Sequence, residues 1–203
     1  MARIKRLERI VALTKELNDH PFQLFPFSYF CEKFTVAKST LSEDVQTVRN
    51  GLAAYDLGII ETVAGASGGV RFIPYHSPES DNEFLWTLAK KLNDPSRLLP
   101  GGMIYMNDLL FSPQISARLG EIIMQRTLEL RPDYIMTVEA KGISLALSTA
   151  RAFNIPMVMA RKEARITEGP AVSISYVSGS SKKIQTMSLP RNCLLYTSDA
   201  ADD

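Results

Sequence analysis

Residues 137–144, which read TVEAKGIS, have the types and spacing of an anion-binding loop. They follow a continuous apolar run and precede a stretch with helical periodicity, and ligands bind at such strand ends in open parallel sheets. Gly142 allows the backbone to approach a ligand, Lys141 adds a positive charge, and the first N–H groups of the helix attract anions. A phosphate is the simplest ligand for this pattern, although many strand-to-helix connections hold a lysine and a glycine by chance.

A second basic segment, ARKEARITEG at 160–169, follows the next apolar run. Arg161, Lys162 and Arg165 are expected near Lys141, because the carboxyl ends of parallel strands share one edge of a sheet. These cations predict a positively charged crevice. The alternative is a solvated surface loop.

The segment 38–54 has the composition of a helix that reads DNA. Leu41, Val45, Val48 and Leu52 recur at steps of four, three and four, which places them on one buried face. The outward positions hold short hydrogen-bonding groups of the kind that contact base edges and phosphates. These outward residues are Lys38, Ser39, Ser42, Gln46, Thr47, Arg49 and Asn50. Thr40 and Glu43 have the spacing of a capping box, which predicts that the helix begins near Thr40.

The elements that position this helix occupy the first 74 residues. Periodicity predicts helices over 3–18 and 25–34, and a glycine-rich linker between strand-like runs at 58–63 and 69–74 predicts a β-hairpin. In the first helix the predicted buried face is Ile4, Leu7, Ile10, Val11, Thr14 and Leu17, and the predicted surface carries Arg3, Lys5, Arg6 and Arg9. Three helices and a hairpin are typical of a winged helix-turn-helix. The alternative is a small helical dimerisation module.

The second region is predicted to be α/β. Helices are expected over 83–94, 113–130 and 143–153, and buried strands over 133–138 and 155–161. A tight Pro-Gly-Gly turn followed by an apolar strand is expected within 98–111. Strand, helix, strand in this order is a βαβ unit. The polar segment 75–83 is expected to separate the two regions.

The composition is that of an ordinary globular protein. The 203 residues carry a formal net charge of +1, which excludes a chain coated in basic residues but leaves room for a local DNA-binding patch. The two cysteines lack metal-type spacing and fit a reduced, cytoplasmic setting. No apolar run is long enough to span a membrane, and no signal peptide is predicted.

Several stretches together resemble the purine operon repressors of Gram-positive bacteria. They are AKSTLSEDV, PGGMIYMNDLL, IMTVEAKGI, RKEARITEG and VSISYVSGSSKKIQTMSL, and the resemblance extends from about residue 3 to Leu189. It implies a winged-helix DNA-binding domain over 1–74 and a partial domain similar to type I phosphoribosyltransferases over 82–189. It also implies a homodimer that binds double-stranded operator DNA and senses phosphoribosyl pyrophosphate (PRPP) together with magnesium, without catalysis and with no other cofactor or metal.

The resemblance assigns roles to particular residues. The recognition helix is expected at about 39–54 and the wing at about 60–73. The implied DNA contacts are Arg3, Lys5, Arg6, Lys38, Ser39, Thr40, Ser42, Thr47 and Arg71. The implied contacts of the PRPP pyrophosphate are Glu139, Ala140, Lys141, Gly142, Arg161 and Lys162. Whether a purine nucleotide competes for this pocket stays open.

Two alternatives to a ligand-regulated repressor remain at this point. The same loop fits an enzyme that transfers a phosphoribosyl group to a purine base. The final residues, 190–203, read PRNCLLYTSDAADD and do not continue the pattern expected of the fold, so we expect a non-native tail and an incomplete effector domain. A chain that does neither task is the second alternative.

Overall fold

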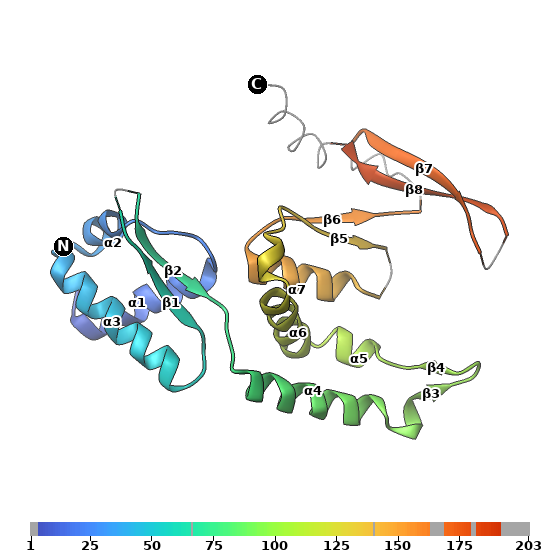
Figure 1. Cartoon of the computed structure of the whole chain (residues 1–203), viewed down its shortest axis with the longest axis horizontal. Coiled ribbons are helices and arrows are strands. Elements are labelled where there is room, and N and C mark those ends of the chain that lie inside the picture. The colour runs from blue at the N-terminus through green and yellow to red at the C-terminus, as the bar shows by residue number, and fades with distance from the viewer. Residues whose placement is uncertain (1–3, 66, 140, 163–168, 180–181, 192–203) are drawn as a thin grey trace.

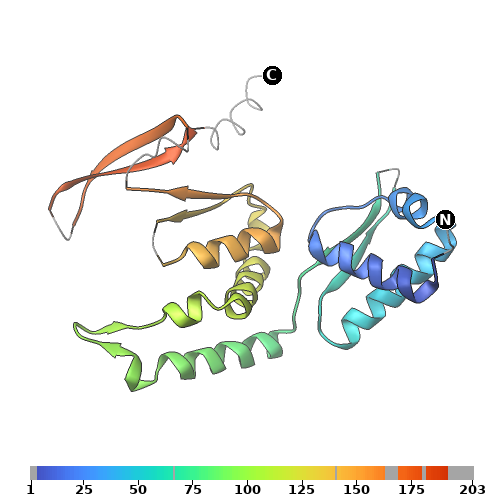
Figure 2. The ribbon, with the colours of Figure 1, turned by 180° about the vertical axis from the view of Figure 1, so that it is seen from behind.

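The computed structural model describes residues 4–65, 67–139, 141–162, 169–179 and 182–191. The chain forms two regions that lie side by side and are joined by an extended segment after β2 (Figures 1 and 2). The tail was predicted to begin at Pro190, but Pro190 ends a paired strand, Ile184–Pro190, so the native pattern continues at least that far. Residues 192–203 of the predicted tail lie outside the described residues.

The first region contains the predicted helices and hairpin. Its elements are α1 (Arg6–Asp19), α2 (Phe27–Phe34), α3 (Lys38–Ala54), β1 (Ile59–Val63) and β2 (Gly69–Ile73). The two strands pair antiparallel, with Ile60 opposite Phe72 and Glu61 opposite Arg71. The buried side chains of all five elements and of the segment before α2 meet in one core, which includes Leu13, Phe30, Leu41 and Val70. The winged-helix prediction for this region is confirmed.

The buried face of α1 differs from the prediction. Leu7 and Val11 are 76% and 69% exposed, whereas Arg9 is only 5% exposed. Leu17 is almost completely buried, as predicted, and Leu13, which was not predicted, is buried beside it. The periodic pattern is ambiguous here because α3 contributes a buried carboxylate, Asp44, which pairs with Arg9 and draws the charged side of α1 inward.

The start of α3 also differs from the prediction. The helix begins at Lys38 with Ala37 as its N-cap, and no side chain caps it. Thr40 therefore lies in the third helical position, where it cannot form a capping box with Glu43. The backbone N–H groups of the first turn remain available at the surface, as at any uncapped helix start.

The second region is α/β, as predicted. Its helices and strands are α4 (Pro78–Leu92), β3 (Leu98–Leu99), β4 (Met103–Ile104), α5 (Asn107–Leu110), α6 (Pro113–Arg126), β5 (Ile135–Val138), α7 (Ile143–Phe153), β6 (Met157–Ala160), β7 (Ala171–Val177) and β8 (Ile184–Pro190), with short 3₁₀ turns at Pro95–Arg97 and Leu128–Leu130. Strands β5 and β6 pair parallel with α7 between them, which confirms the βαβ unit. Helix α6 lies against α7, and the β7–β8 hairpin extends from the far side of the sheet (Figure 1).

Two elements of this region differ from their predicted form. Helix α4 begins at Pro78, inside the segment expected to be a polar linker, because the Ser77 hydroxyl accepts a hydrogen bond from the Ser80 N–H and caps it. The apolar strand expected after the Pro-Gly-Gly turn is only two residues long, and Asn107–Leu110 forms a short helix instead.

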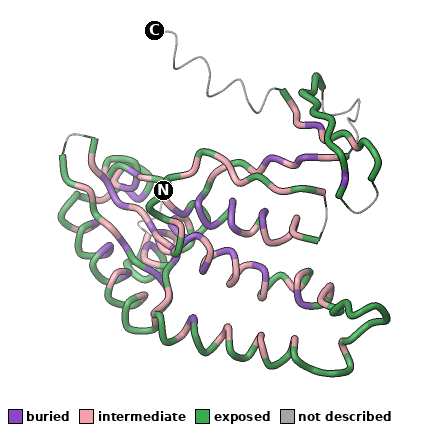
Figure 3. Tube along the Cα trace, turned by 45° about the vertical axis from the view of Figure 1, so that its right-hand side comes forward, coloured by how far each residue is buried: buried purple, intermediate pink, exposed green. Residues whose placement is uncertain are grey.

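The two regions share apolar contacts. Phe22, from the loop after α1, stacks on Phe153 of α7 at 6.0 Å between ring centroids. It packs against the small cluster formed by Met124, Ala152 and Phe153. Buried residues occur in the first region and also along the helices of the second region (Figure 3).

Candidate nucleic-acid interface and effector site

The outward face of α3 carries the polar side chains predicted to contact DNA. Lys38, Ser39, Ser42 and Thr47 are exposed, whereas Thr40 is half-buried. Lys38 and Ser42 border a groove of about 730 Å³ that Phe27 of α2 and the wing residue Thr62 also line. The structure therefore brings the start of the recognition helix and the wing to one surface.

Two hydroxyl groups on α3 are engaged within the helix. Ser42 Oγ donates to the Lys38 carbonyl at 2.9 Å, and Thr47 Oγ1 donates to the Glu43 carbonyl at 2.9 Å. Such bonds to the preceding turn are common for serine and threonine in helices. Because each hydroxyl hydrogen is used within the helix, each oxygen can act only as an acceptor toward other groups. Thr47 Oγ1 already accepts from Arg6 Nη2 at 3.3 Å, whereas Ser42 Oγ is suited to accept a hydrogen bond from a base amino group.

Arg49 joins the recognition helix to the wing, a role that the sequence did not reveal. Its Nε donates to the Ile60 carbonyl at 3.0 Å, Nη2 to Thr62 Oγ1 at 2.5 Å, and Nη1 to Gln46 Oε1 at 2.7 Å. Two of these bonds fix β1 against α3, and the bond to Gln46 orients the guanidinium within the helix. The sequence places Arg49 on the outward face, but its wing partners lie 11 and 13 residues away and leave no local signal.

Arg71 lies on the other face of the wing from α3. Successive residues of a strand point to opposite faces, and its neighbours Val70 and Phe72 are buried in the core with α3. The Arg71 side chain pairs with Glu61 on the opposite strand at 2.5 Å and borders a second cavity with Phe153 and Leu128. The geometry does not bring Arg71 together with the other predicted DNA contacts.

This placement gives a test on the salt dependence of DNA binding. Lys38→Ala is expected to reduce the slope of log affinity against log salt by about one, as for the loss of one phosphate contact, and Arg71→Ala is expected to leave it unchanged. Fluorescence anisotropy with one duplex at several salt concentrations measures both slopes. A reduced slope for Arg71→Ala alone would place the interface on the opposite face of the wing.

The basic residues near the N-terminus are divided between surface and core. Lys5 and Arg6 lie at the start of α1, and Arg6 contacts Asp44 and Thr47 of α3. Arg9 is buried, so its predicted surface position was wrong. Arg3 lies outside the described residues.

The loop after β5 and the end of β6 meet as the sequence predicted. Val138 lies opposite Ala160 in the parallel register, and the Glu139 N–H donates to the Ala160 carbonyl at 2.8 Å. Arg161 Nη1 donates to Glu139 Oε1 at 2.7 Å. Glu139 and Arg161 are therefore adjacent at the carboxyl edge of the sheet.

Three more residues of the predicted anion site lie at the same edge of the sheet. Gly142 is the N-cap of α7, and Lys141 and Lys162 are both exposed beside the same edge. Ala140 and the segment 163–168, which contains Arg165, lie outside the described residues. Glu139 offsets part of the charge of Arg161, and Lys141 and Lys162 add two exposed positive charges at this edge.

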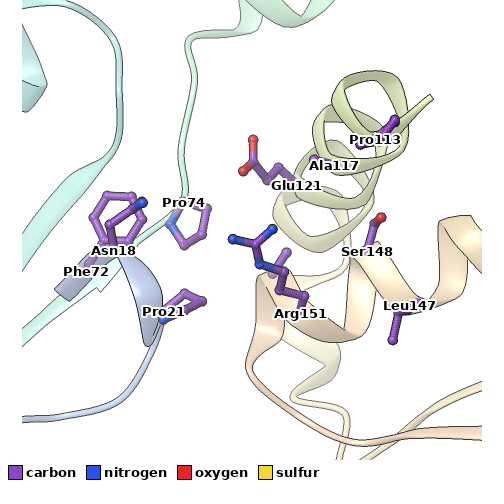
Figure 4. A pocket seen from close by; sticks show the side chains of 11 residues that line it. Asn18, Pro21, Phe72, Pro74, Pro113, Ala117, Glu121, Leu147, Ser148 and Arg151 are labelled. Carbon is purple, nitrogen blue, oxygen red and sulfur yellow. The ribbon is translucent and has the colours of Figure 1, made fainter. Parts of the chain in front are cut away.

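A cleft of about 300 Å³ separates the two regions (Figure 4). Glu121 of α6 and Arg151 of α7 project into it from one side, and Phe72 and Pro74 line the other. His76, in the connecting segment, donates from Nδ1 to the Asp56 carbonyl at 2.8 Å and places Nε2 3.1 Å from Glu121 Oε2. His76 thereby links the turn after α3 to α6.

Burial raises the pKa of the Glu121 carboxyl above its usual value, although Arg118 and Arg151 partly oppose this effect. Burial also raises the pKa of Asp81, which pairs with Arg118 at 2.9 Å. Glu121 at the cleft and Asp81 at the contact between α4 and α6 therefore hold their protons more tightly in the folded chain than in the unfolded chain.

The raised pKa of Glu121 predicts how stability depends on pH. A group of this kind contributes stability that is fully present below its unfolded pKa, about 4.5, and is lost as the pH rises through the raised folded pKa. Glu121→Gln is expected to remove this component, so that stability falls less steeply as the pH rises above about 4.5. Urea unfolding across this pH range is the measurement, and Glu129→Gln, at an exposed site, is the charge-matched control. Equal pH dependence in wild type and Glu121→Gln would contradict the assignment.

Metal-ligating and membrane-spanning features are missing from the described residues. Among them, no three histidine, cysteine or acidic side chains gather where a metal ion could be held. None of the helices in the described part of the chain is long and apolar enough to cross a membrane.

The fold defines a winged-helix DNA-binding region joined to an α/β region with a parallel βαβ unit. The family model "Bacterial purine repressor, N-terminal" matches residues 5–74. The chain is 41% identical to the purine biosynthesis transcriptional repressor of Bacillus subtilis over 95% of its own length and 67% of that protein. It is 36% identical to the purine biosynthesis transcriptional activator of Lactococcus lactis over 94% of its length and 70% of that protein. The chain belongs to this family of bacterial purine regulators.

The chain is also similar to a phosphoribosyltransferase. The chain is 34% identical to a xanthine phosphoribosyltransferase of Deinococcus deserti over 95 residues, which are 45% of this chain and 49% of that protein. Together with the βαβ unit, this agrees with the predicted similarity to the phosphoribosyltransferase fold.

Proposed function

We propose that this chain binds double-stranded operator DNA through α3 and the wing and represses purine biosynthesis genes. The observation that carries the proposal is the polar outward face of α3, whose start shares one groove with the wing. The relative from Bacillus subtilis, named as a repressor, supports the direction of regulation.

Binding to a duplex from upstream of a purine biosynthesis gene tests this proposal. We expect tighter binding to this duplex than to a random duplex of equal length at matched salt, because phosphate contacts alone do not distinguish sequences. Equal affinity for both duplexes would contradict operator recognition. A reporter fused to the same upstream region tests the direction: deletion of the gene raises expression if the protein represses, and lowers it if the protein activates as the Lactococcus lactis relative is named to do.

The second region is proposed to act as a sensor of PRPP. Its pyrophosphate would lie against residues 139–142, with Lys141 and Lys162 as the positive charges, and magnesium would arrive with the ligand. Gly142 at the start of α7 and the exposure of both lysines support this role. Binding of PRPP with magnesium is expected to weaken operator binding.

Sensing rather than catalysis is proposed for this region. The relatives that match nearly the whole chain are named as transcriptional regulators, whereas the transferase match covers under half of it. An assay for nucleotide formation from PRPP and each purine base tests the point, and measurable turnover would support the enzyme alternative. The proposed homodimer is tested by light scattering of the chain alone and with operator DNA.

A further inference from the structure

We propose that Asp44 is a positioning residue for DNA binding, because it holds the Arg6 guanidinium at the DNA-facing surface. This inference rests on the proposed function. It concerns a buried residue that has no direct access to DNA: the Asp44 side chain is 0% exposed, whereas the Arg6 side chain is 57% exposed.

The carboxylate of Asp44 divides its two oxygens between two arginines of α1. Oδ2 accepts from Arg9 Nε at 2.5 Å within the core. Oδ1 accepts from Arg6 Nε at 3.2 Å, and Arg6 Nη2 reaches Thr47 Oγ1 at 3.3 Å. Arg6 is thereby tied to the recognition helix at two points, one buried and one exposed.

A negatively charged partner stabilises Arg6 at its position in α1. Arg6 is the first residue of α1, where the helix dipole disfavours a positive charge. Asp44 offsets this unfavourable placement from a neighbouring helix. Arg6 is therefore held next to the start of the recognition helix α3, although its position at the start of α1 is unfavourable for a positive charge.

The held guanidinium is well suited to bind a phosphate. Within the described part of the chain, Arg6 Nη1 has no partner, so its N–H groups remain available. Arg6 also lines a groove of about 570 Å³ with Lys5, Thr35 and Thr40, between the starts of α1 and α3. A guanidinium whose fork is already oriented loses less conformational entropy when it contacts a phosphate, and it can do so with two hydrogen bonds.

The direction in which Asp44→Asn changes the affinity for DNA distinguishes this positioning role from a general effect of charge. Asp44→Asn removes a negative charge near the DNA surface, so charge alone predicts tighter binding to DNA. Positioning through Arg6 predicts the opposite, which is weaker binding. Glu43→Gln removes an exposed carboxylate from the same helix and is the charge-matched control, for which equal or tighter binding is expected.

A double-mutant cycle on the full chain tests whether Asp44 acts through Arg6. We expect Asp44→Asn to weaken DNA binding roughly fivefold when Arg6 is present and to have little effect in the Arg6→Met background. Anisotropy titrations at one salt concentration give the four affinities. Additive effects of the two changes, or tighter binding by Asp44→Asn, would overturn the proposal.

A second variant covers the case in which Asp44→Asn does not fold. The paired change Arg9→Met and Asp44→Leu removes the carboxylate together with its buried partner, so no unpaired charge remains in the core. This variant is also expected to bind DNA roughly fivefold more weakly than wild type, with no further loss on Arg6→Met. Wild-type affinity in the folded paired variant would overturn the proposal.

The titrations are run on the operator duplex and on a random duplex. Phosphate contacts contribute to both, so the cycle can be read on the random duplex even if wild type shows no preference for the operator. Equal affinity for the two duplexes would contradict operator recognition, and the Asp44 proposal would then be judged from the cycle on the random duplex alone. No binding to either duplex would overturn both proposals.

Discussion

Replacing Arg9 with methionine is expected to lower the free energy of unfolding of the first region by about 3–5 kcal/mol, because Asp44 would remain buried with its main partner removed. Arg9 is 5% exposed, and its Nε lies 2.5 Å from Asp44 Oδ2. The remaining contact, from Arg6, is longer and comes from a side chain that is largely in water. Urea unfolding followed by circular dichroism measures the loss.

The matched control is the paired change Arg9→Met and Asp44→Leu. Replacing both members of a buried ion pair with apolar side chains of similar size is often neutral or stabilising. We therefore expect the paired variant to recover most of the lost stability. If Arg9→Met unfolds at the same midpoint urea concentration as wild type, the Arg9–Asp44 pair makes no measurable contribution to stability. Arg9 would then behave like an ordinary surface cation. If the paired variant is as unstable as the single one, packing around Arg9 rather than charge explains the loss.

The Arg9–Asp44 pair also shows why one part of the first region could not be predicted. Apolar periodicity locates α1, α2 and α3 to within a few residues, because each helix needs an apolar face in the common core. The rotation of α1 depends on a carboxylate 35 residues further along the chain. No pattern within α1 reports on this partner, so periodicity alone places Leu7 and Val11 in the core and Arg9 at the surface.

The carboxyl edge of the β5–β6 sheet was easier to predict than the proposed DNA-binding surface. A βαβ unit places the residues after its two strands at one edge by topology alone, and Glu139 and Arg161 accordingly meet. The sequence could not show that these two residues pair with each other. It also could not assign a face to Arg71, because the direction of a wing side chain depends on the hairpin register.

The second large effect is expected at the contact between α6 and α7. Gly120→Val is expected to lower the stability of the second region by about 3 kcal/mol, near the upper end for overpacking. A Cβ atom at this position would lie 2.6 Å from the Ser148 carbonyl carbon and 2.7 Å from the Thr149 nitrogen. These are backbone atoms of α7, so the helix itself must move to make room.

A displaced α7 would also disturb the proposed sensor. The helix begins at Ile143, directly after the loop at 139–142, and its other end carries Arg151 at the cleft between the regions. We therefore expect Gly120→Val to weaken PRPP binding and to increase hydrogen exchange in α6 and α7. Exchange in α1 and α3 should stay as in wild type, because these helices belong to a separate core.

Gly51→Ala is the control for the backbone effect of replacing a helical glycine. Gly51 lies within α3, and a Cβ atom added there would meet no neighbouring atom within 4 Å. Alanine there is expected to stabilise the first region by about 0.5–1 kcal/mol through its higher helix propensity. Opposite signs at the two glycines identify steric crowding against α7 as the cause at Gly120. Wild-type stability of Gly120→Val would instead show that α6 and α7 are not held at this distance.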